Sequence, residues 1–511
     1  MYYMNAIRNK LAPLIPRNWQ EIIGKVYRSD LAKKISRGIA WTFFSTVVYR
    51  GLIFFTSIIV ARILNKEGFG ELGMVRSTID MFVIFSSFSL GLTTTRYVAE
   101  NKVTDKIKAG RIIKLASGLS WIFGITVGGL MFLFSDQLAE QSLHASYLSD
   151  ELKLSALAIM LNAINGTQNG TLAGFEAFKN MARVNLLATG INFPISIFLA
   201  WQLGVKGAVL GLVLNGLFSC VLGAIEVRKV ARKFGVNIYE KGSRSEARVL
   251  LHFSLPAVLG NSLILPVNWA CNTILARQPE GFKELGIYNA GLSILVMVNV
   301  INGMLGQVLL PYAVANFKEK NRKFEMLNNQ LPWAIGIFIA LAFMLIPELG
   351  ELLFGKDFSG PVLRATIVLV MLSTIITSYR QGINRNFSAS GYMWWSFLGN
   401  GLMGAATLAF MYLWKDYGAI GRAGCYAIAI AFSTVVFIPL YLKKGLCDRG
   451  YLASAESLAI WSIIFIAFVI AFWTHIHSVM ARIGILLFLL GGINYLFIRY
   501  FKKYVLYKKR Y

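Results

Sequence analysis

Apolar stretches of about 20 residues follow one another along this chain from Gly38 to Tyr500, separated by short polar connections. A helix of this length crosses the hydrocarbon core of a bilayer. Because 56% of the 511 residues are hydrophobic and only 15% are charged, a soluble core could not bury this much apolar surface. The sequence therefore predicts an all-α polytopic membrane protein.

The apolar stretches divide into about 14 transmembrane helices. Short polar connections leave no room for a large extramembrane domain. The expected helices cover residues 38–64, 74–96, 112–134, 153–175, 182–203, 206–227, 250–275, 286–314, 331–354, 361–383, 393–414, 418–441, 456–474 and 479–499.

The basic residues test this segmentation, because Lys and Arg accumulate in short loops on the cytoplasmic side. Every second predicted connection is basic, and the intervening ones are poor in Lys and Arg. Both ends of the chain are basic as well, so we expect a multi-pass protein with both termini in the cytoplasm. This topology accounts for the net charge of +26 without a nucleic-acid partner, since the charges are spread over all the inner loops.

An internal duplication relates the two halves of the chain. The segment Glu67–Gly73 returns as Glu280–Gly286 after 213 residues, and Gly204–Gly207 returns as Gly418–Gly421 after 214. The duplication implies two lobes of six helices each. Because six is even, both lobes begin on the same side of the membrane, so they are parallel and enclose a central cavity. We expect the repeated Gly-rich segments to be tight turns, one in each lobe.

The last two helices lie outside the duplication. We accordingly divide the chain into a basic N-terminal arm (1–37), an N-lobe (38–228), an inter-lobe loop (229–249), a C-lobe (250–445), and a C-terminal helix pair with a basic tail (446–511).

Three charged residues fall inside the first two predicted helices. Arg50 lies about 18 Å from the inner end of its helix, at about 1.5 Å per residue. An unpaired charge at that depth costs several kcal/mol, so we expect it to face protein or water and to serve a function. Arg76 and Asp80 are four residues apart on one helix face and are able to pair. Asp80 either neutralises an arginine or titrates during a transport cycle.

Amide and hydroxyl side chains line the first two helices of the C-lobe instead of charges. They suit sugar hydroxyls, which both donate and accept hydrogen bonds, but amides also bind membrane helices to one another. The candidates are Asn261, Asn268, Asn272, Asn289, Ser293 and Asn302.

Signs of catalysis are missing from the sequence. The four cysteines show no metal-ligand spacing, and His475 and His477 have no third ligand nearby. No nucleotide motif or paired carboxylate appears, and every predicted outer loop is short. We therefore predict no catalytic residue, metal or cofactor, and we expect a transporter in preference to a membrane polysaccharide polymerase or glycosyltransferase.

Four motifs stand out between residues 38 and 445: Ala61-Arg62-Ile63-Leu64 before Glu67-Gly68-Phe69-Gly70, Thr95-Arg96-Tyr97-Val98-Ala99, Phe253-Ser254-Leu255-Pro256, and Gly286-Ile287-Tyr288-Asn289-Ala290. They resemble those of the polysaccharide-export branch of the multidrug/oligosaccharidyl-lipid/polysaccharide (MOP) flippase superfamily. Flippases for capsule repeat units and for O-antigen, the polysaccharide part of lipopolysaccharide, belong to this branch. The resemblance covers roughly residues 38–445.

This resemblance implies a bacterial inner-membrane flippase. Its substrate would be an undecaprenyl-pyrophosphate-linked oligosaccharide, turned from the inner to the outer leaflet by alternating access. Arg50 and Arg76 would contact the pyrophosphate, the amides would receive the sugars, and the lipid tail would stay among membrane lipids. A polysaccharide polymerase and chain-length proteins are the expected partners.

Two other branches of the superfamily are alternatives. Lipid II flippases also have a cationic cavity and 14 helices, but they carry a further arginine early in helix eight, where this chain reads Tyr288-Asn289-Ala290-Gly291. Multidrug and cation antiporters typically use an acidic residue in helix one, where this chain has Arg50. We rank lipid II transport second and drug export third.

Overall fold

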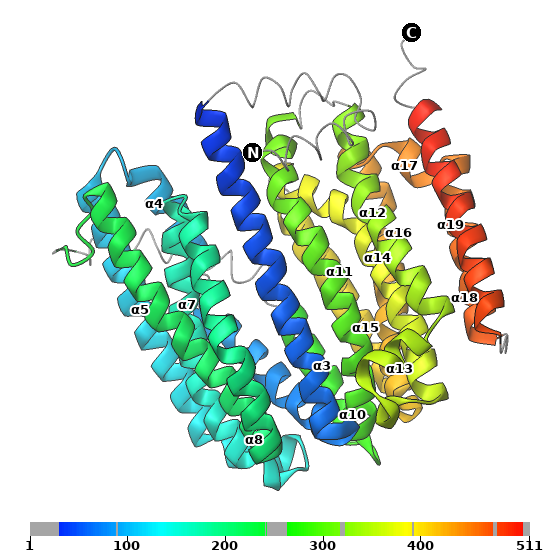
Figure 1. Ribbon diagram of the computed structural model, residues 1–511, viewed down its shortest axis with the longest axis horizontal. Helices are drawn as coiled ribbons and strands as arrows, with labels where there is room; N and C mark the ends of the chain where they lie inside the picture. Colours follow the sequence, from blue (N-terminus) through cyan, green and yellow to red (C-terminus); the bar gives the residue numbers. More distant parts are fainter. Residues whose placement is uncertain are drawn as a thin grey trace, which may run out of the picture.

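The computed structural model describes residues 30–87, 90–240, 242, 263–316, 322–390, 393–473 and 478–503. Within these ranges the chain is a bundle of long helices without strands (Figure 1). Nine of the described helices are long and apolar enough to cross a membrane, which confirms the predicted all-α polytopic class. The count of 14 stays a prediction. The described residues leave out 1–29, residues 241 and 243–249 of the predicted inter-lobe loop, the motif at 253–256 and Asn261.

Two sharp bends divide the long helices of the N-lobe. Asn65 (φ 57°) divides α3 into two arms, and Gly204 (φ 59°) does the same in α8. Both bends fall where the sequence predicted connections between helices. The elements of this lobe are α3 (Asp30–Ser87), α4 (Leu90–Asn101), α5 (Lys106–Leu133), α6 (Ser135–Gln137), η2 (Leu138–Ser142), η3 (Ser146–Leu148), α7 (Ser149–Gly174) and α8 (Phe178–Phe234).

The C-lobe and the added helix pair follow in the second half of the chain. In Figure 1, α18 and α19 lie at the edge of the bundle, beside the C-lobe. The elements are α10 (Ile264–Ala276), α11 (Gly281–Asn316), α12 (Arg322–Leu345), α13 (Glu348–Phe354), η5 (Lys356–Phe358), α14 (Pro361–Ser390), α15 (Met393–Leu413), η6 (Lys415–Tyr417), α16 (Gly418–Lys443), α17 (Arg449–Ala453), α18 (Ala455–Trp473) and α19 (Val479–Phe501).

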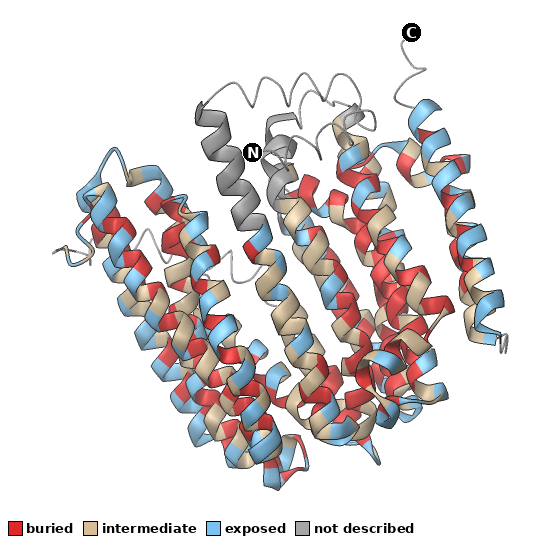
Figure 2. Cartoon of the chain, viewed as in Figure 1, coloured by how far each residue is buried: buried red, intermediate tan, exposed pale blue. Residues whose placement is uncertain are grey.

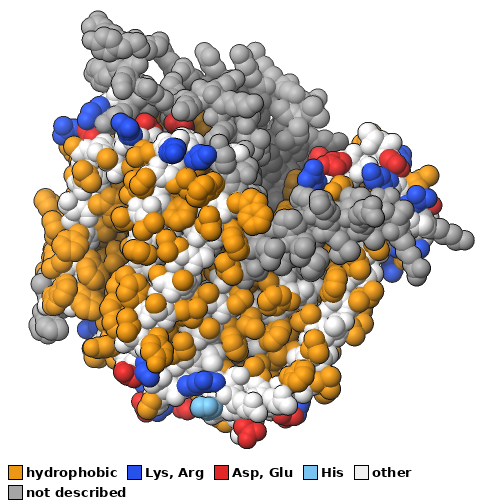
Figure 3. Space-filling model, turned by 180° about the vertical axis from the view of Figure 1, so that it is seen from behind, with side chains coloured by type: hydrophobic (Ala, Val, Ile, Leu, Met, Phe, Trp, Pro, Cys, Tyr) orange, Lys and Arg blue, Asp and Glu red, His pale blue; other side chains and the backbone are white. Residues whose placement is uncertain are grey.

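The surface has the layering of a membrane protein. Apolar side chains cover the middle of the face in Figure 3, and charged side chains gather at its two ends. Large apolar residues such as Trp201, Phe465 and Phe488 are exposed, as contact with lipid requires. The start of α3 and the end of α19 lie at the same end of the bundle (Figure 1).

Burial is greatest along α14, which runs through the middle of the C-lobe (Figure 2). Next to it, the fully buried Trp333 of α12 packs against four rings, with ring centroids 5.0–5.6 Å away. Each such aromatic pair contributes about 0.5–1.5 kcal/mol beyond its area burial. The rings come from α14, α17, α18 and α19, so the cluster fixes the added helix pair to the C-lobe: Tyr379, Tyr451, Trp461 and Phe497.

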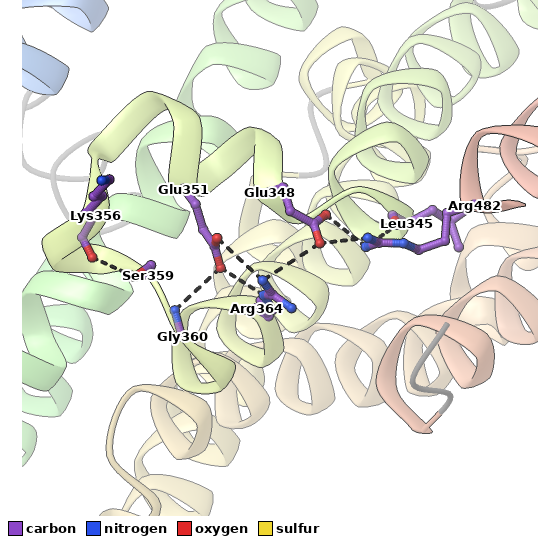
Figure 4. Close-up of polar contacts among 8 residues, drawn as sticks. All are labelled: Leu345, Glu348, Glu351, Lys356, Ser359, Gly360, Arg364 and Arg482. Carbon is purple, nitrogen blue, oxygen red and sulfur yellow. Dashed lines mark hydrogen bonds and ion pairs between the residues drawn. The ribbon is translucent and has the colours of Figure 1, made fainter. Parts of the chain in front are cut away.

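A polar network holds α19 at the other end of the same lobe (Figure 4). Arg482 of α19 donates to both carboxylate oxygens of Glu348, at 2.8 and 2.7 Å. Arg364 of α14 donates to Glu351 at 2.8 Å, and its guanidinium lies 3.8 Å from Glu348. Charged groups from α13, α14 and α19 are therefore joined where the helices leave the apolar layer.

Candidate substrate cavity

A cavity of about 890 Å³ lies between the N-lobe helices α3 and α8 and the C-lobe helices α10, α11 and α16. This confirms the central cavity predicted from the duplication. Its volume is at the upper end of the range for pockets that enclose a drug-sized ligand. Polar side chains project into it from both lobes: Arg50, Ser57, Arg76, Ser77, Asp80, Thr189, Asn192, Ser196, Asn215, Asn268, Asn272, Asn289, Ser293 and Arg422.

The two copies of the repeated motif pack against each other at one end of this cavity, which we call the motif end. A Cβ atom on Gly70 would lie 1.8 Å from the carbonyl oxygen of Phe282, and one on Gly286 would lie 1.8 Å from that of Lys66. Only glycine permits this approach of two backbones. Because Phe69 and other motif residues also line the cavity, the packed motifs form its end wall.

This packing corrects the predicted role of the motif glycines. The residues from Glu67 to Gly73 are helical, so the glycines do not make a turn. The chain turns at Asn65 in the first copy and at Glu280 (φ 55°) in the second. The glycines instead allow the two lobes to meet, which sequence comparison within one chain could not reveal.

Two equivalent arginines cross between the lobes next to the motifs. Arg62 of the N-lobe donates to the carbonyl oxygens of Leu352 and Leu353 in the C-lobe. Arg277 of the C-lobe donates to those of Gln141 and Ser142 in the N-lobe, at 2.8 and 2.6 Å. Arg62 and Arg277 therefore make reciprocal contacts between the two lobes, and these contacts hold the motif end closed.

Arg50 projects from the first arm of α3 into the cavity. Its Nε donates to the Tyr49 hydroxyl at 3.1 Å, and its guanidinium lies 5.2 Å from the centre of that ring. Within the described residues no carboxylate pairs with it. The side chain is exposed to the cavity, so its charge is available to a ligand.

Arg76 and Asp80 both line the cavity from the second arm of α3. No ion pair joins them within the described part of the chain, so the carboxylate does not neutralise the arginine by direct contact. Asp80 is the one acidic residue among the described lining residues, whereas three arginines are present. In the same ranges no group of three or more His, Cys, Asp or Glu residues is placed to hold a metal.

Arg422 is a charged lining residue that sequence reasoning missed. It lies in the first turns of α16, is 1% exposed, and donates from Nη2 to Asn268 Oδ1 at 3.0 Å and from Nε to Asn272 Oδ1 at 3.1 Å. Its guanidinium also lies 4.7 Å from the centre of the Tyr288 ring. The available signal was an arginine four residues after Gly418, within an apolar stretch.

The remaining predicted amides divide between the cavity and helix packing. Asn289 and Ser293 line the cavity, and the Ser293 hydroxyl donates to the Asn289 carbonyl oxygen at 2.8 Å. Asn302 is fully buried and donates to Ser378 at 3.0 Å, so it joins α11 to α14 and does not line the cavity. Asn261 lies outside the described residues.

The N-lobe wall carries amides that the sequence did not single out. Asn192 donates to Ser196 at 2.6 Å, within α8. The side-chain amide oxygens of Asn192 and Asn215 are buried and have no hydrogen-bond partner among the described residues. Both residues line the cavity, so this wall offers acceptors toward a ligand.

Comparison with known proteins places this arrangement among transport proteins. The family model described as "Polysaccharide biosynthesis protein" matches residues 35–317. The chain is 20% identical to the EPS I polysaccharide export inner membrane protein EpsE of Ralstonia nicotianae over 417 residues, covering 76% of this chain and 91% of EpsE. It is 25% identical to the lipopolysaccharide biosynthesis protein WzxC of Escherichia coli K12 over 366 residues, covering 68% and 69% of the two chains.

A solved structure has the same arrangement of helices. The lipid II flippase MurJ, in an inward closed conformation, matches with a TM-score of 0.67 at 12% identity, covering 90% of this chain and 98% of that one. At this identity the likeness shows the fold alone.

Proposed function

Because the chain belongs to the polysaccharide biosynthesis protein family, in the polysaccharide-export branch of the MOP flippase superfamily, we propose that it is a flippase for a lipid-linked oligosaccharide. It is a transporter of the inner membrane, not an enzyme. Its substrate is an undecaprenyl-pyrophosphate-linked repeat unit, which it moves from the inner to the outer leaflet for polysaccharide synthesis.

The cationic cavity between the lobes is the observation that supports this function. A pyrophosphate loses its hydration when it leaves the membrane surface, and only opposite charge or hydrogen-bond donors offset that cost. Arg50 faces the cavity and has no acidic partner in the described part of the chain, so it is our choice for the pyrophosphate contact. Arg76 adds a second cation on the way toward the motif end.

Alternating access gives the packed motifs a role. With both termini in the cytoplasm, the motif end faces the outside, and the cavity takes its substrate from the inner leaflet. Separation of the motif copies and of the Arg62 and Arg277 contacts then opens the cavity outward. A polysaccharide polymerase and chain-length proteins receive the exported unit.

Lipid II transport is the second candidate, because the fold matches a lipid II flippase and the cavity is cationic. The absence of an arginine at the start of α11, where Tyr288-Asn289-Ala290-Gly291 stands, argues against it. Cation export is disfavoured by three arginines against one acid in the lining.

Arg50→Ala in the native bacterium tests the assignment. Lipid-linked oligosaccharide should accumulate in the inner leaflet while its synthesis continues, and Arg50→Lys should restore part of the export. Arg228→Ala removes an exposed arginine of α8 outside the cavity and is the matched control. Normal export without Arg50 would contradict its role, and accumulation of lipid II instead would support the second candidate.

A further inference from the structure

Among the described residues, Arg422 is a buried cation with no anion beside it. Its hydrogen-bond partners there are the neutral amides Asn268 and Asn272, and its Nη1 atom has no partner. Burying an unpaired charge costs several kcal/mol, which two amides and one aromatic ring offset only in part. Arg422 also lines the cavity, so a ligand there can supply the missing negative charge.

The hydrogen bonds of Arg422 decide what the two amides offer. An amide whose oxygen already accepts a bond has mainly its NH2 group left for a ligand. The NH2 of Asn272 donates to Ser77 at 3.2 Å, so that of Asn268 is the one left toward the cavity. The buried NH2 group of Asn289 lies against Gly73, 1.8 Å from where a Cβ on that glycine would be, and has no hydrogen-bond partner among the described residues. Beside Arg422 the C-lobe wall therefore offers donors, from Nη1 of Arg422 and from the NH2 group of Asn268.

The opposite wall has the reverse character, because the side-chain amide oxygens of Asn192 and Asn215 lack a hydrogen-bond partner in the described ranges. Sugar hydroxyls can use either wall, since they donate and accept. A carboxylate or phosphate only accepts, so the wall around Arg422 suits it and the wall on α8 does not.

The subsite lies at the motif end, away from Arg50. Arg422 lies four residues after Gly418, at the start of α16. Ala419, in the same turn as Gly418, donates its N–H to the motif residue Glu284 at 2.7 Å. Arg50 is 14 residues before Leu64, the last residue ahead of the bend, or about 21 Å along the helix at about 1.5 Å per residue. One pyrophosphate held at Arg50 does not reach Arg422, whereas the attached sugars extend beyond it.

We propose that Arg422, with Asn268, forms an oxyanion subsite for a carboxylate on a sugar, and hence that the transported oligosaccharide is acidic. This inference rests on the proposed flippase function and names its substrate class. The pyrophosphate is the other source of an oxyanion, and the experiment separates the two.

Binding to the purified full-length protein in detergent tests the subsite, with three probes: a glucuronate-containing disaccharide, its neutral glucose counterpart, and inorganic pyrophosphate. Wild-type protein should bind the acidic disaccharide at least about tenfold more tightly than the neutral one. Asn268→Asp should abolish that preference, because the new carboxylate occupies Arg422 and repels the ligand. The Asn268→Asp variant retains the bond to Arg422, so its melting temperature should stay near that of the wild type. The test therefore does not depend on an Arg422→Gln variant, which would lose the buried guanidinium altogether.

Gln137→Glu makes the same amide-to-carboxylate change at an exposed site outside the cavity and should leave the preference intact. The proposal fails if Asn268→Asp keeps the preference, or if it weakens only pyrophosphate binding. Failure of the flippase function itself would give a different result. Cells that carry Arg50→Ala would then export the oligosaccharide normally, independently of how tightly the purified protein binds the acidic disaccharide.

Discussion

Gly70 of the N-lobe lies against Gly286 of the C-lobe: a Cβ atom built on Gly70 would be 2.9 Å from the Gly286 nitrogen. The two glycines belong to the two copies of one duplicated segment. The most similar parts of the two halves are therefore in contact with each other, at the place where the lobes must separate for outward opening.

Gly70→Ala should weaken the closed motif end. The added methyl overlaps the Phe282 carbonyl, and overpacking of this kind typically costs about 1–3 kcal/mol. We expect faster modification of a cysteine introduced at Ser293 by a reagent added from the motif side. Gly129→Ala is the control, because its methyl meets nothing within 4 Å. Equal labelling of both variants would contradict a packing role.

Arg62 and Arg277 should stabilise the same state of the protein, the one in which the motif end is closed. Each donates to two carbonyl oxygens of the opposite lobe, and since both side chains are exposed we expect about 1 kcal/mol from each. The double alanine variant should shift the distance between spin labels on the two lobes further than either single variant. Unchanged distances in all three variants would show that these contacts do not hold the lobes together.

The helices and the cavity were predictable because their signals are local or repeated. Apolar length gives the spans, alternating charge supports their order, and the duplication implies two lobes. The exact turns were not predictable from the glycines, because Asn65 and Glu280 adopt positive φ while the motif glycines serve contacts made across the lobes.

The site was predicted only in part, for a related reason. Arg50, Arg76 and Asp80 stand out in the sequence as charges deep in apolar helices, and all three line the cavity. Arg422 stands near a predicted helix end, where an arginine normally reaches the membrane surface. Its burial depends on α10 and α11 folding over it. In the sequence, Asn302 resembles the other candidate amides of the C-lobe. Only the packing of the helices shows that it contacts Ser378 and does not line the cavity.

Asp80→Asn tests the electrostatics of the cavity. The change removes the one acid from a described lining that holds three arginines, without breaking an ion pair to Arg76. Pyrophosphate should therefore bind severalfold more tightly at low ionic strength, and the gain should shrink as salt screens the charges. Asp416→Asn is the control, because it makes the same carboxylate-to-amide change at an exposed site outside the described lining. Weaker binding after Asp80→Asn would instead assign Asp80 a direct part in holding the ligand.

Acid should release α19 from the C-lobe through Glu348. Burial by itself raises the pKa of this carboxyl, but the bonds from Arg482, the backbone N–H at the start of α13, and the charges of Arg482 and Arg364 outweigh it and hold the pKa below its ordinary value. A carboxylate with a lowered pKa stabilises the fold above its unfolded pKa, about 4.3 for glutamate, and loses that contribution as the pH falls through the folded value. Wild-type protein should therefore melt higher than Glu348→Gln at pH 7, and the difference should vanish in acid.

Arg482→Lys is the matched variant for the same measurement. Lysine keeps the charge but cannot donate to both oxygens of Glu348 as the guanidinium does. Its melting temperature at pH 7 should fall between those of the wild type and Glu348→Gln. Because Trp333 and its four rings fix the other end of the helix pair, we expect local loosening of α19 and not loss of the fold. Hydrogen exchange confined to the first turns of α19 would agree with this, and exchange along the whole C-lobe would contradict it.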